Sequence, residues 1–476
     1  MNRVVVIGGG LTGLTAAHRL STRASARGRS VEVVLLEAKD RLGGSIWTDR
    51  RDGFLLEGGA DSFITNKPWA VDLCRELGLS GSLIGTDEAR RRSFVVRNGQ
   101  LMPVPEGFVM MAPSRLGPIL TTPILSWRGK LRILLDLIVP RKTDDADESL
   151  ASFVKRRLGR EALDRLVQPL VGGIYTADPN DLSLKATLPQ FAAMEREHGG
   201  LIRAGMRMRK SDREASGARY GLFASLADGM ETLPRALASA LPPGSIRLNT
   251  PVRRITRPDP LGSWWIEPLD SPPIEASAVI LASEAHASAR LVDGFDPDLA
   301  LHLRSIPYAS SIVASVAYPR NAIAHPLDGF GAVVPILEGR SILAVSFTSI
   351  KFPSRAPSDS VLLRVFVGGA TQPELFDLPD DAIEALIRKE LGELIGASGA
   401  PTFIQIARHA RGMPQYTLGH LDRVAAIREL QRNHPGLGLA GNAFDGVGIP
   451  DCVRSGQSAA DAILSSLDEA SRKAVA

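Results

Sequence analysis

The chain has 476 residues, more than one hydrophobic core usually supports, and this length predicts two or three domains. Its composition, 44% hydrophobic and 23% charged, is typical of a folded globular protein and excludes a disordered or fibrous one. With 56 basic and 52 acidic residues, the net charge of +4 is too small to call for a nucleic-acid partner. The charge is compatible with an anionic substrate or an anionic membrane surface.

Cysteine and histidine usage narrows the class further. The two cysteines, Cys74 and Cys452, cannot build a disulfide framework, so we expect a reducing compartment and a cytoplasmic protein. The eight histidines are scattered and no Cys-x-x-Cys occurs, which predicts no metal site. No run of about 18 apolar residues is present, so the sequence predicts no transmembrane helix.

The N-terminal segment carries the pattern of a dinucleotide-binding unit. Val4–Ile7 is a short apolar run bounded by glycine, which predicts a buried parallel strand. Gly8-Gly9-Gly10-Leu11-Thr12-Gly13 then fits G-x-G-x-x-G and precedes a helix expected over Leu14–Leu20. A second apolar strand, Val31–Leu36, is followed by Glu37. A strand, a glycine-rich turn, a helix and a strand ending in an acid together predict dinucleotide binding.

Each part of this unit has a physical task. Gly8 allows the tight turn, Gly10 lets the backbone approach a pyrophosphate, and Gly13 lets the helix pack closely on the strand. The helix N-terminus offers free N–H groups to the phosphates. The Glu37 carboxylate is placed to accept hydrogen bonds from ribose hydroxyls. We expect a longer loop than usual over Ser21–Ser30, which accounts for the late position of Glu37.

The segment that starts at Glu37 distinguishes between the dinucleotides. Glu37-x-x-x-Arg41-x-Gly43-Gly44 resembles the E-x-x-x-R-x-G-G pattern of the FAD-dependent amine oxidase-like superfamily. In that superfamily the arginine and the glycines pass beside the phosphate and ribityl portion of the flavin. Residues Glu57–Ser62 resemble the superfamily's segment near the isoalloxazine ring, where glycine permits close approach of the backbone. The resemblance implies that FAD is the cofactor.

The C-terminal end repeats the order of strand, glycine-rich loop and helix. Leu437–Pro450 precedes a helix expected over Asp451–Leu467. The residues available to pack that helix are Val453, Ala460, Ile463, Leu464 and Leu467. In the resembling superfamily this loop closes over the flavin, and the helix N-terminus stabilises negative charge on the reduced ring. Asn442 stands where many members carry Asp, and its amide can still bond the ribityl chain.

The middle of the chain has a different character. Residues 105–140 are rich in Met, Leu, Ile and Pro with interspersed Arg and Lys, and the prolines at 113, 118 and 123 are expected to break them into short helices. Such a patch lines an apolar pocket, docks on a membrane surface or forms a plain helical core. Strands expected over 246–255 and 263–281 return to the cofactor domain, with Val252 where relatives contact the adenine. The strands expected to form a substrate-domain sheet are residues 312–318, 341–347 and 361–367.

Three longer motifs narrow the resemblance. Pro169–Leu184, Ser225–Pro234 and Gly446–Cys452 are similar to segments of the oxygen-dependent porphyrinogen oxidases of haem biosynthesis. The resemblance implies a six-electron oxidation of coproporphyrinogen III or protoporphyrinogen IX to the porphyrin. Each of three two-electron steps reduces FAD, which oxygen reoxidises with release of hydrogen peroxide. Because the pyrrole nitrogens of the macrocycle can lose protons themselves, no strong protein base is required and no catalytic residue is predicted.

The propionates of such a substrate need cations at the rim of an apolar slot. The candidate residues are Lys67, Arg91, Arg92 and Ser93, the last at a position where many protoporphyrinogen oxidases have Arg. Ala60–Phe63 resembles the P-D-S-F segment of the bacterial coproporphyrinogen III oxidases, which favours coproporphyrinogen without excluding protoporphyrinogen.

Two other interpretations stay open. An amine or carotenoid-type flavin oxidase would carry the same N-terminal motif, although five Tyr and five Trp leave little for an aromatic cage. A flavin-binding protein without chemistry is disfavoured by intact motifs at both chain ends. The expected partners are the porphyrinogen, molecular oxygen, the inner face of the cell membrane as a peripheral contact, a second copy of the chain in a homodimer, and the next enzyme of the haem pathway; nucleic acid is not expected.

The predicted fold class is α/β. A discontinuous FAD-binding Rossmann-like domain is expected over residues 1–88, 216–290 and 429–476, a β-sheet substrate domain over 89–104 and 291–428, and a helical membrane or substrate-access domain over 105–215. The residues predicted to hold FAD are Gly8, Gly9, Gly10, Leu11, Thr12, Gly13, Glu37, Ala38, Arg41, Gly43, Gly44, Ser45, Gly59, Ala60, Asp61, Ser62, Val252, Asn442, Val447, Gly448 and Ile449.

Overall fold

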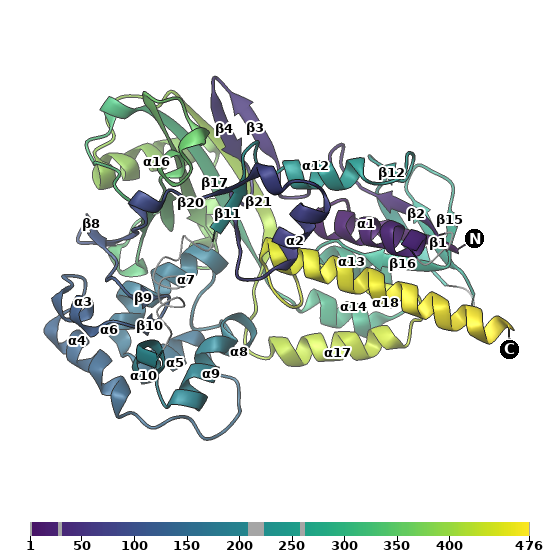
Figure 1. The fold of residues 1–476 in the computed structure, drawn as a ribbon, viewed down its shortest axis with the longest axis horizontal. Coiled ribbons are helices and arrows are strands. Elements are labelled where there is room, and N and C mark those ends of the chain that lie inside the picture. The colour runs from purple at the N-terminus through teal and green to yellow at the C-terminus, as the bar shows by residue number, and fades with distance from the viewer. Residues whose placement is uncertain (1, 27–30, 208–222, 258–261, 476) are drawn as a thin grey trace.

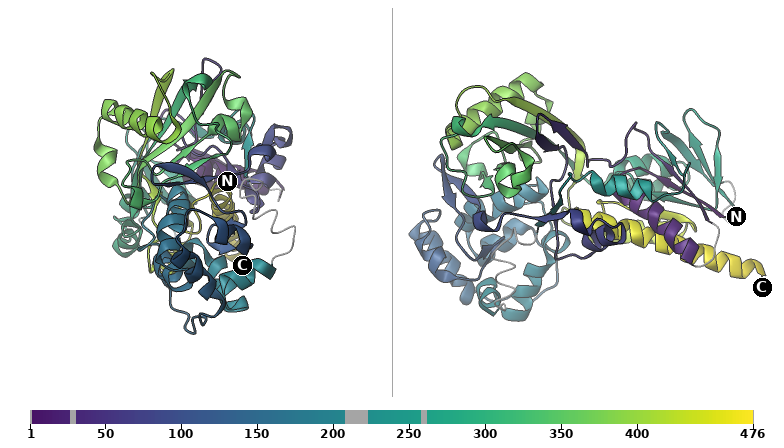
Figure 2. Two further views of the ribbon diagram at one scale, coloured as in Figure 1. Left: turned by 90° about the vertical axis from the view of Figure 1, so that its left-hand side faces the viewer. Right: turned by 45° about the horizontal axis from the view of Figure 1, so that its top comes forward.

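The computed structural model describes residues 2–26, 31–207, 223–257 and 262–475. Figure 1 shows a parallel sheet beside both ends of the chain, and a second sheet next to a group of helices. The second sheet has seven strands. The two further views in Figure 2 show the same division into three parts. We refer to these parts as the parallel sheet, the seven-stranded sheet and the helical part.

The parallel sheet has five strands in the order β12-β2-β1-β16-β22, and every neighbouring pair is parallel. The strands are β1 (Asn2–Ile7), β2 (Val31–Leu36), β12 (Ile246–Arg247), β16 (Ala278–Leu281) and β22 (Leu437–Leu439). The continuous apolar runs in β1 and β2 are explained by burial on both faces. Strands from both ends and the middle of the chain therefore form one layer.

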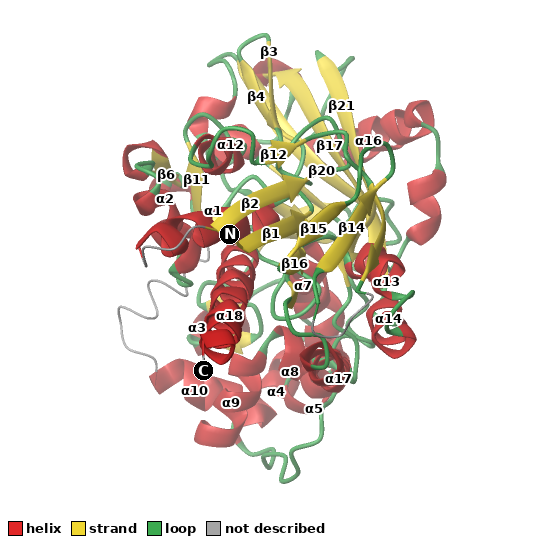
Figure 3. Cartoon of the chain, turned by 90° about the vertical axis from the view of Figure 1, so that its right-hand side faces the viewer, coloured by secondary structure: helices red, strands yellow, loops and turns green. Residues whose placement is uncertain are grey.

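Helices and a small sheet cover the two faces of the parallel sheet (Figure 3). Val4 and Val6 pack in the core on one face, whereas Val5 and Ile7 pack in the core on the other. The first core includes α1 (Leu11–Ala26), α2 (Trp69–Glu76), α12 (Thr232–Ser239) and α18 (Ile449–Val475). The second includes β13 (Val252–Thr256), β14 (Trp264–Pro268), β15 (Ile274–Ala276), α13 (Ala285–Val292), α14 (Pro297–Arg304) and α17 (His420–Arg432).

The two helices at the chain ends pack directly on one another. A Cβ on Gly456 of α18 would lie 2.4 Å from the carbonyl oxygen of Thr12 in α1. The predicted packing residues of the last helix, from Val453 to Leu467, are all buried. The prediction of a loop from Ser21 is wrong, because α1 continues to Ala26. The Ser25 hydroxyl donates back to the Ser21 carbonyl (2.9 Å), so these polar side chains are accommodated within the helix.

The seven-stranded sheet has the order β21-β17-β20-β19-β18-β7-β8 and is antiparallel except between β18 and β7. Its strands are β7 (Phe94–Arg97), β8 (Gln100–Pro103), β17 (Tyr308–Pro319), β18 (Gly331–Val333), β19 (Ala344–Ser346), β20 (Ser360–Gly368) and β21 (Phe403–Pro414). One face packs on α16 (Asp380–Ile395). The three strands predicted for this sheet are confirmed as β17, β19 and β20.

The helical part has its own apolar core. Its helices are α3 (Leu116–Thr121), α4 (Trp127–Leu134), α5 (Leu150–Arg157), α6 (Arg160–Ala162), α7 (Gln168–Tyr175), α8 (Leu184–Thr187), α9 (Pro189–His198) and α10 (Leu201–Arg207). The expectation of helices throughout 105–140 is wrong at its start, because β9 (Phe108–Val109) and β10 (Ala112–Pro113) form a hairpin. Pro118 lies in the first turn of α3, where a missing N–H costs nothing. In the described part of the chain, no helix is long and apolar enough to cross a membrane.

Short elements connect these parts. They are β3 (Thr48–Arg51), β4 (Phe54–Glu57), β5 (Phe63–Ile64), β6 (Leu83–Gly85), β11 (Phe223–Leu226) and α15 (Thr348–Lys351). Within the range 291–428, predicted as substrate domain, α14 and α17 pack in the core of the parallel sheet. The contribution of that range to the seven-stranded sheet therefore starts at β17 and ends at β21.

Candidate functional site

The glycine-rich turn lies at the carboxyl end of β1, which is where open parallel sheets bind ligands. A Cβ on Gly13 would lie 1.9 Å from the Gly8 carbonyl oxygen, so only glycine lets α1 start so close to the strand. A Cβ on Gly10 would meet no atom nearer than 3.9 Å. A side chain would therefore collide at Gly13, whereas the position of a side chain at Gly10 is not crowded. The lack of crowding at Gly10 is what a pyrophosphate needs in order to approach the turn there.

Glu37 lies at the carboxyl end of the neighbouring strand, against the same turn. Its carboxylate accepts hydrogen bonds from the backbone N–H groups of Gly9 (2.6 Å) and Lys39 (2.8 Å). The Thr250 N–H donates to the Glu37 carbonyl (2.8 Å), and this bond lies two residues before β13 begins at Val252. The structure thus brings together the acid and the β13 segment that the sequence assigned to adenosine.

The arginine–glycine segment completes this end of the site. The Gly43 N–H donates to the Gly9 carbonyl (2.9 Å), and a Cβ on Gly44 would lie 3.2 Å from the Gly10 Cα. Arg41 donates to the Gly44 carbonyl (2.7 Å) and so holds the turn that ends at Ser45. The turns at residues 8–13 and 41–45 therefore lie against each other, and Gly10 between them is half-buried.

The C-terminal loop, defined as residues 440–448, leaves the edge strand β22 at the same end of the sheet. A Cβ on Gly441 would make an ordinary van der Waals contact with the Ser283 carbonyl oxygen at 3.7 Å, so the backbone here is not crowded. The helix α18 begins at Ile449, directly after Val447 and Gly448. Burial raises the pKa of the neighbouring Cys452 thiol to about 11, which argues against a thiolate that could bond covalently to a flavin.

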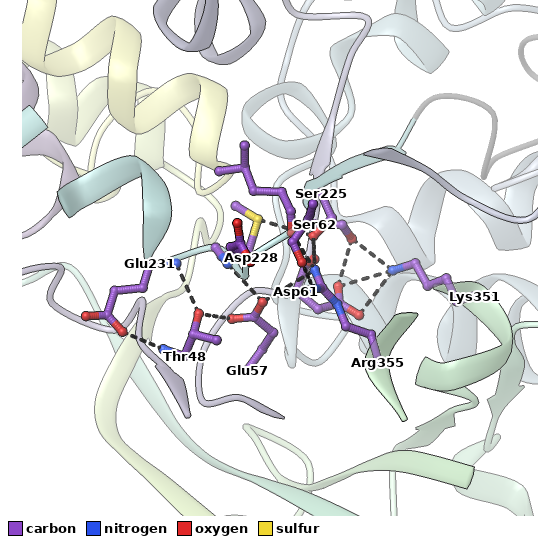
Figure 4. A network of polar contacts seen from close by, with 12 residues as sticks. Thr48, Glu57, Asp61, Ser62, Ser225, Asp228, Glu231, Lys351 and Arg355 are labelled. Carbon is purple, nitrogen blue, oxygen red and sulfur yellow. Dashed lines mark hydrogen bonds and ion pairs between the residues drawn. The ribbon is translucent and has the colours of Figure 1, made fainter. Parts of the chain in front are cut away.

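The segment Glu57–Ser62, predicted to run near the isoalloxazine ring, contributes two carboxylates to a buried group of charged side chains (Figure 4). The Asp61 carboxylate lies 3.1 Å from Lys351 Nζ and 3.3 Å from Arg364 Nη1. Lys351 also donates to the Ser62 hydroxyl (2.8 Å), and Arg364 donates to the Gly59 carbonyl. Burial opposes ionisation of Asp61, but the charges of Lys351 and Arg364 hold its pKa well below the usual range.

The second half of this group, which we call the buried ion cluster, centres on Glu57. Its carboxylate accepts from the Met230 N–H (2.9 Å) and the Thr48 hydroxyl (2.8 Å), and it lies 3.7 Å from Arg355. Arg355 donates to the Leu226 carbonyl and the Ser225 hydroxyl, both at 2.8 Å. Burial raises the pKa of Glu57 and lowers that of Arg355. The cluster holds two carboxylates and three cations: Glu57, Asp61, Lys351, Arg355 and Arg364.

The three cations of this cluster were not among the site residues predicted from the sequence. Arg364 lies in the apolar run of β20, where 3% of the residue is exposed, and a charged residue in such a strand is rarely buried without a partner. The position of Arg364 within an apolar strand was therefore the sequence signal that could have indicated a buried ion pair. Neither Lys351 nor Arg355 lies in a pattern that indicates burial.

The four residues predicted to bind propionates are not gathered in one place. Lys67 is paired with Asp451 in the first turn of α18 (2.7 Å), on the cofactor side. Arg91 is paired with Glu88 and Arg92 with Asp328, and both precede β7 with Ser93. Each of the three cations therefore already has a carboxylate partner, which a substrate propionate would have to replace.

The arrangement defines a class of protein: a dinucleotide-binding fold in which both chain ends contribute to one cofactor site next to a second sheet. The model of the family of flavin containing amine oxidoreductases matches residues 11–464. The chain therefore belongs to that family, and it is an FAD-dependent oxidoreductase. The uncrowded backbone at Gly10 and Gly441 and the acid at Glu37 fit FAD, which these residues would hold.

Curated relatives are similar over nearly the whole chain. Coproporphyrinogen III oxidase of Propionibacterium freudenreichii is 37% identical, over 97% of this chain and 90% of the relative. The Bacillus subtilis protein of the same name is 33% identical over 98% of each chain. Protoporphyrinogen oxidase 2 of Arabidopsis thaliana is 28% identical, over 98% of this chain and 95% of the relative.

Solved structures agree with the fold. A structure from Exiguobacterium sp. is 32% identical with a TM-score of 0.87, over 98% of this chain and 99% of that chain. Its description assigns it as a protoporphyrinogen oxidase without a demonstrated activity. A putrescine oxidase is 18% identical with a TM-score of 0.69, over 98% of this chain and 99% of that chain, and shares the fold alone.

We predict that Gly10→Ala weakens FAD binding without destabilising the apoprotein. The new methyl group has room in the protein but fills the space that the pyrophosphate approaches, so the Kd for FAD should rise roughly tenfold or more. Gly13→Ala should lower both FAD affinity and the Tm of the apoprotein, because its methyl group collides with the Gly8 carbonyl. Titration of apoprotein with FAD and thermal unfolding measure both effects. Wild-type affinity in Gly10→Ala would contradict this assignment.

We predict that Asp61→Asn destabilises the protein by about 3–5 kcal/mol, because it leaves two buried cations without their carboxylate. The folded-state pKa of Asp61 is lowered, so its stabilisation is complete above the ordinary value of 3.8 and is lost as the pH falls below that value. Urea unfolding as a function of pH measures this, and the two stability curves should converge in acid. Asp144→Asn, at an exposed loop carboxylate, is the control and should leave the free energy of unfolding nearly unchanged.

Proposed function

We propose that this protein oxidises coproporphyrinogen III to coproporphyrin III in haem biosynthesis, with oxygen as the electron acceptor. The observation that carries the proposal is the similarity, over nearly the full chain, to bacterial coproporphyrinogen III oxidases, which is greater than that to plant protoporphyrinogen oxidases. Protoporphyrinogen IX is the second candidate substrate, supported by the description of the Exiguobacterium structure.

The reaction balances without a protein base. The porphyrinogen loses six electrons and six hydrogens, and three oxygen molecules become three molecules of hydrogen peroxide. FAD supplies the two-electron acceptor that oxygen restores. The chain would hold the cofactor and the substrate and keep water away from them. The buried ion cluster supports this role, because its ion pairs fix the segment Glu57–Ser62 that is predicted to run near the isoalloxazine ring.

We expect the purified protein to show the absorbance spectrum of bound flavin and to convert coproporphyrinogen III to a fluorescent porphyrin. Peroxide should form in a ratio of about three to one with porphyrin, as the electron balance requires. Coproporphyrinogen III, protoporphyrinogen IX and polyamines are supplied separately, and kcat/KM is compared. Oxidation of polyamines alone would replace the proposal by an amine oxidase. Bound flavin with no substrate oxidised would favour the non-catalytic alternative.

We further propose that the protein is cytoplasmic and docks peripherally on the inner face of the cell membrane through residues 105–140. Within this range, an apolar stripe is exposed on α4 and the turn that follows it: Trp127 (70%), Leu131 (60%), Leu135 (45%) and Ile138 (74%). The spacing of three and four residues places them on one helical face. Arg128 and Arg141, both exposed, supply positive charge that anionic lipids attract. We also propose, from the sequence, that the protein forms a homodimer and transfers the porphyrin to the next haem-pathway enzyme.

Replacing two stripe residues should abolish this docking. We expect Trp127→Glu with Leu131→Glu to lower co-sedimentation with phosphatidylglycerol vesicles roughly tenfold or more, because two large apolar side chains no longer enter the interface. The matched control is Leu301→Glu, at an equally exposed leucine on α14. Equal binding of both variants and the wild type would contradict the assignment of the stripe.

A further inference from the structure

The C-terminal loop needs support from outside itself. It contains three glycines, Gly441, Gly446 and Gly448, and glycine loses more conformational freedom on ordering than any other residue. Bonds at its two ends tie it down: the Ala440 N–H donates to the Leu281 carbonyl, and the Cys452 N–H donates to the Gly448 carbonyl. Arg428 and Arg454 contact the middle of the loop, residues 442–446, at Asp445, and two buried side chains that precede the loop bond its backbone directly.

The first of these side chains is Tyr416, which follows β21 and is 2% exposed. Its hydroxyl donates to the Asn442 carbonyl (2.7 Å) and accepts from the Gly446 N–H (2.7 Å). One hydroxyl therefore spans the loop between two backbone groups four residues apart. Burial raises the pKa of Tyr416, so the hydroxyl stays protonated and keeps its donor.

The second side chain is His420 at the start of α17, which is 0% exposed. Its Nε2 lies 3.0 Å from the Phe444 carbonyl, and because a carbonyl only accepts, Nε2 carries the proton. Burial lowers the pKa of His420, which favours this neutral ring. The ring stacks on Tyr416 with a centroid distance of 3.9 Å and an interplanar angle of 13°. The two side chains, which we call the Tyr416–His420 clamp, form one rigid unit.

The clamp lies where the three parts of the molecule meet. The Tyr416 carbonyl accepts from the Ser183 N–H of the helical part (2.8 Å), and β21, which Tyr416 follows, belongs to the seven-stranded sheet. Its side chain reaches the loop at the carboxyl end of the parallel sheet, where α18 packs on the start of α1 (Figure 1). The loop is therefore positioned relative to all three parts through one residue.

We propose that Tyr416 and His420 are positioning residues that hold the C-terminal loop in the conformation that binds FAD. Both side chains contact backbone groups of the loop, so they act through its shape. The sequence signal for the clamp is Gln415-Tyr416-x-x-Gly419-His420, in which Gly419 has a φ of +77° and turns the chain into α17. Both residues lie outside the glycine-rich motifs, and their contacts with the loop are the same whichever porphyrinogen is oxidised.

Tyr416→Phe tests the hydroxyl alone, since the ring and its stacking remain. We expect the Kd of the apoprotein for FAD to rise about tenfold or more, because two hydrogen bonds to the loop are lost. Turnover per bound flavin should change less than about twofold. Tyr318→Phe, at a buried tyrosine of the seven-stranded sheet, is the matched control and should bind FAD as the wild type does.

His420 is tested by a pair of variants. His420→Leu removes the donor and should weaken FAD binding as Tyr416→Phe does, whereas His420→Gln keeps an N–H at a similar reach and should restore most of the affinity. Flavin fluorescence during titration gives the Kd, and apoprotein Tm separates loop effects from a loss of folding. If His420→Leu does not fold, Tyr416→Phe decides alone. Wild-type FAD affinity in Tyr416→Phe would overturn the proposal.

Discussion

The relative position of the cofactor-binding part and the seven-stranded sheet depends on the buried ion cluster. Five charged side chains leave water together, and each isolated charge would cost several kcal/mol in such an environment. The cost is offset because Glu57 and Asp61, from the segment after the parallel sheet's first strands, meet Arg364 of β20 and two cations, Lys351 and Arg355, from the segment that precedes β20. A shift between the two parts would separate several pairs at once, so the cluster allows one arrangement.

This constraint explains how a cofactor site can be built from distant segments of the chain. The glycine-rich turn at Gly8–Gly13 and the C-terminal loop meet because β1 and β22 flank the same strand, β16. The segment Glu57–Ser62 is held at the site because its carboxylates pair with Arg364 of β20 and with Lys351 and Arg355 just before that strand. The Tyr416–His420 clamp then ties the loop to the end of β21. Each of these contacts joins residues that are far apart in sequence.

Much of the fold could be predicted from the spacing of apolar residues along short segments of the sequence. The strands Val4–Ile7 and Val31–Leu36 and the packing face of α18 were predictable, because a buried strand or helix face needs apolar residues at a fixed period. The end of α1 was not predictable, since Ser and Thr are typical of loops but here bond to carbonyls of their own helix. The hairpin at 108–113 was missed because its residues are as apolar as those of a helix.

For the site, the sequence by itself determined the glycine-rich turn, the acid at Glu37 and the glycine loop before α18. These residues act through backbone conformation and strand position, which neighbouring residues specify. Only the tertiary structure decided which charges pair. Lys67 and Arg92 form ion pairs with Asp451 and Asp328, whereas Lys351 and Arg364 are buried against Asp61. A charge is visible in the sequence, but its partner and its burial depend on the distance between segments that only folding brings together.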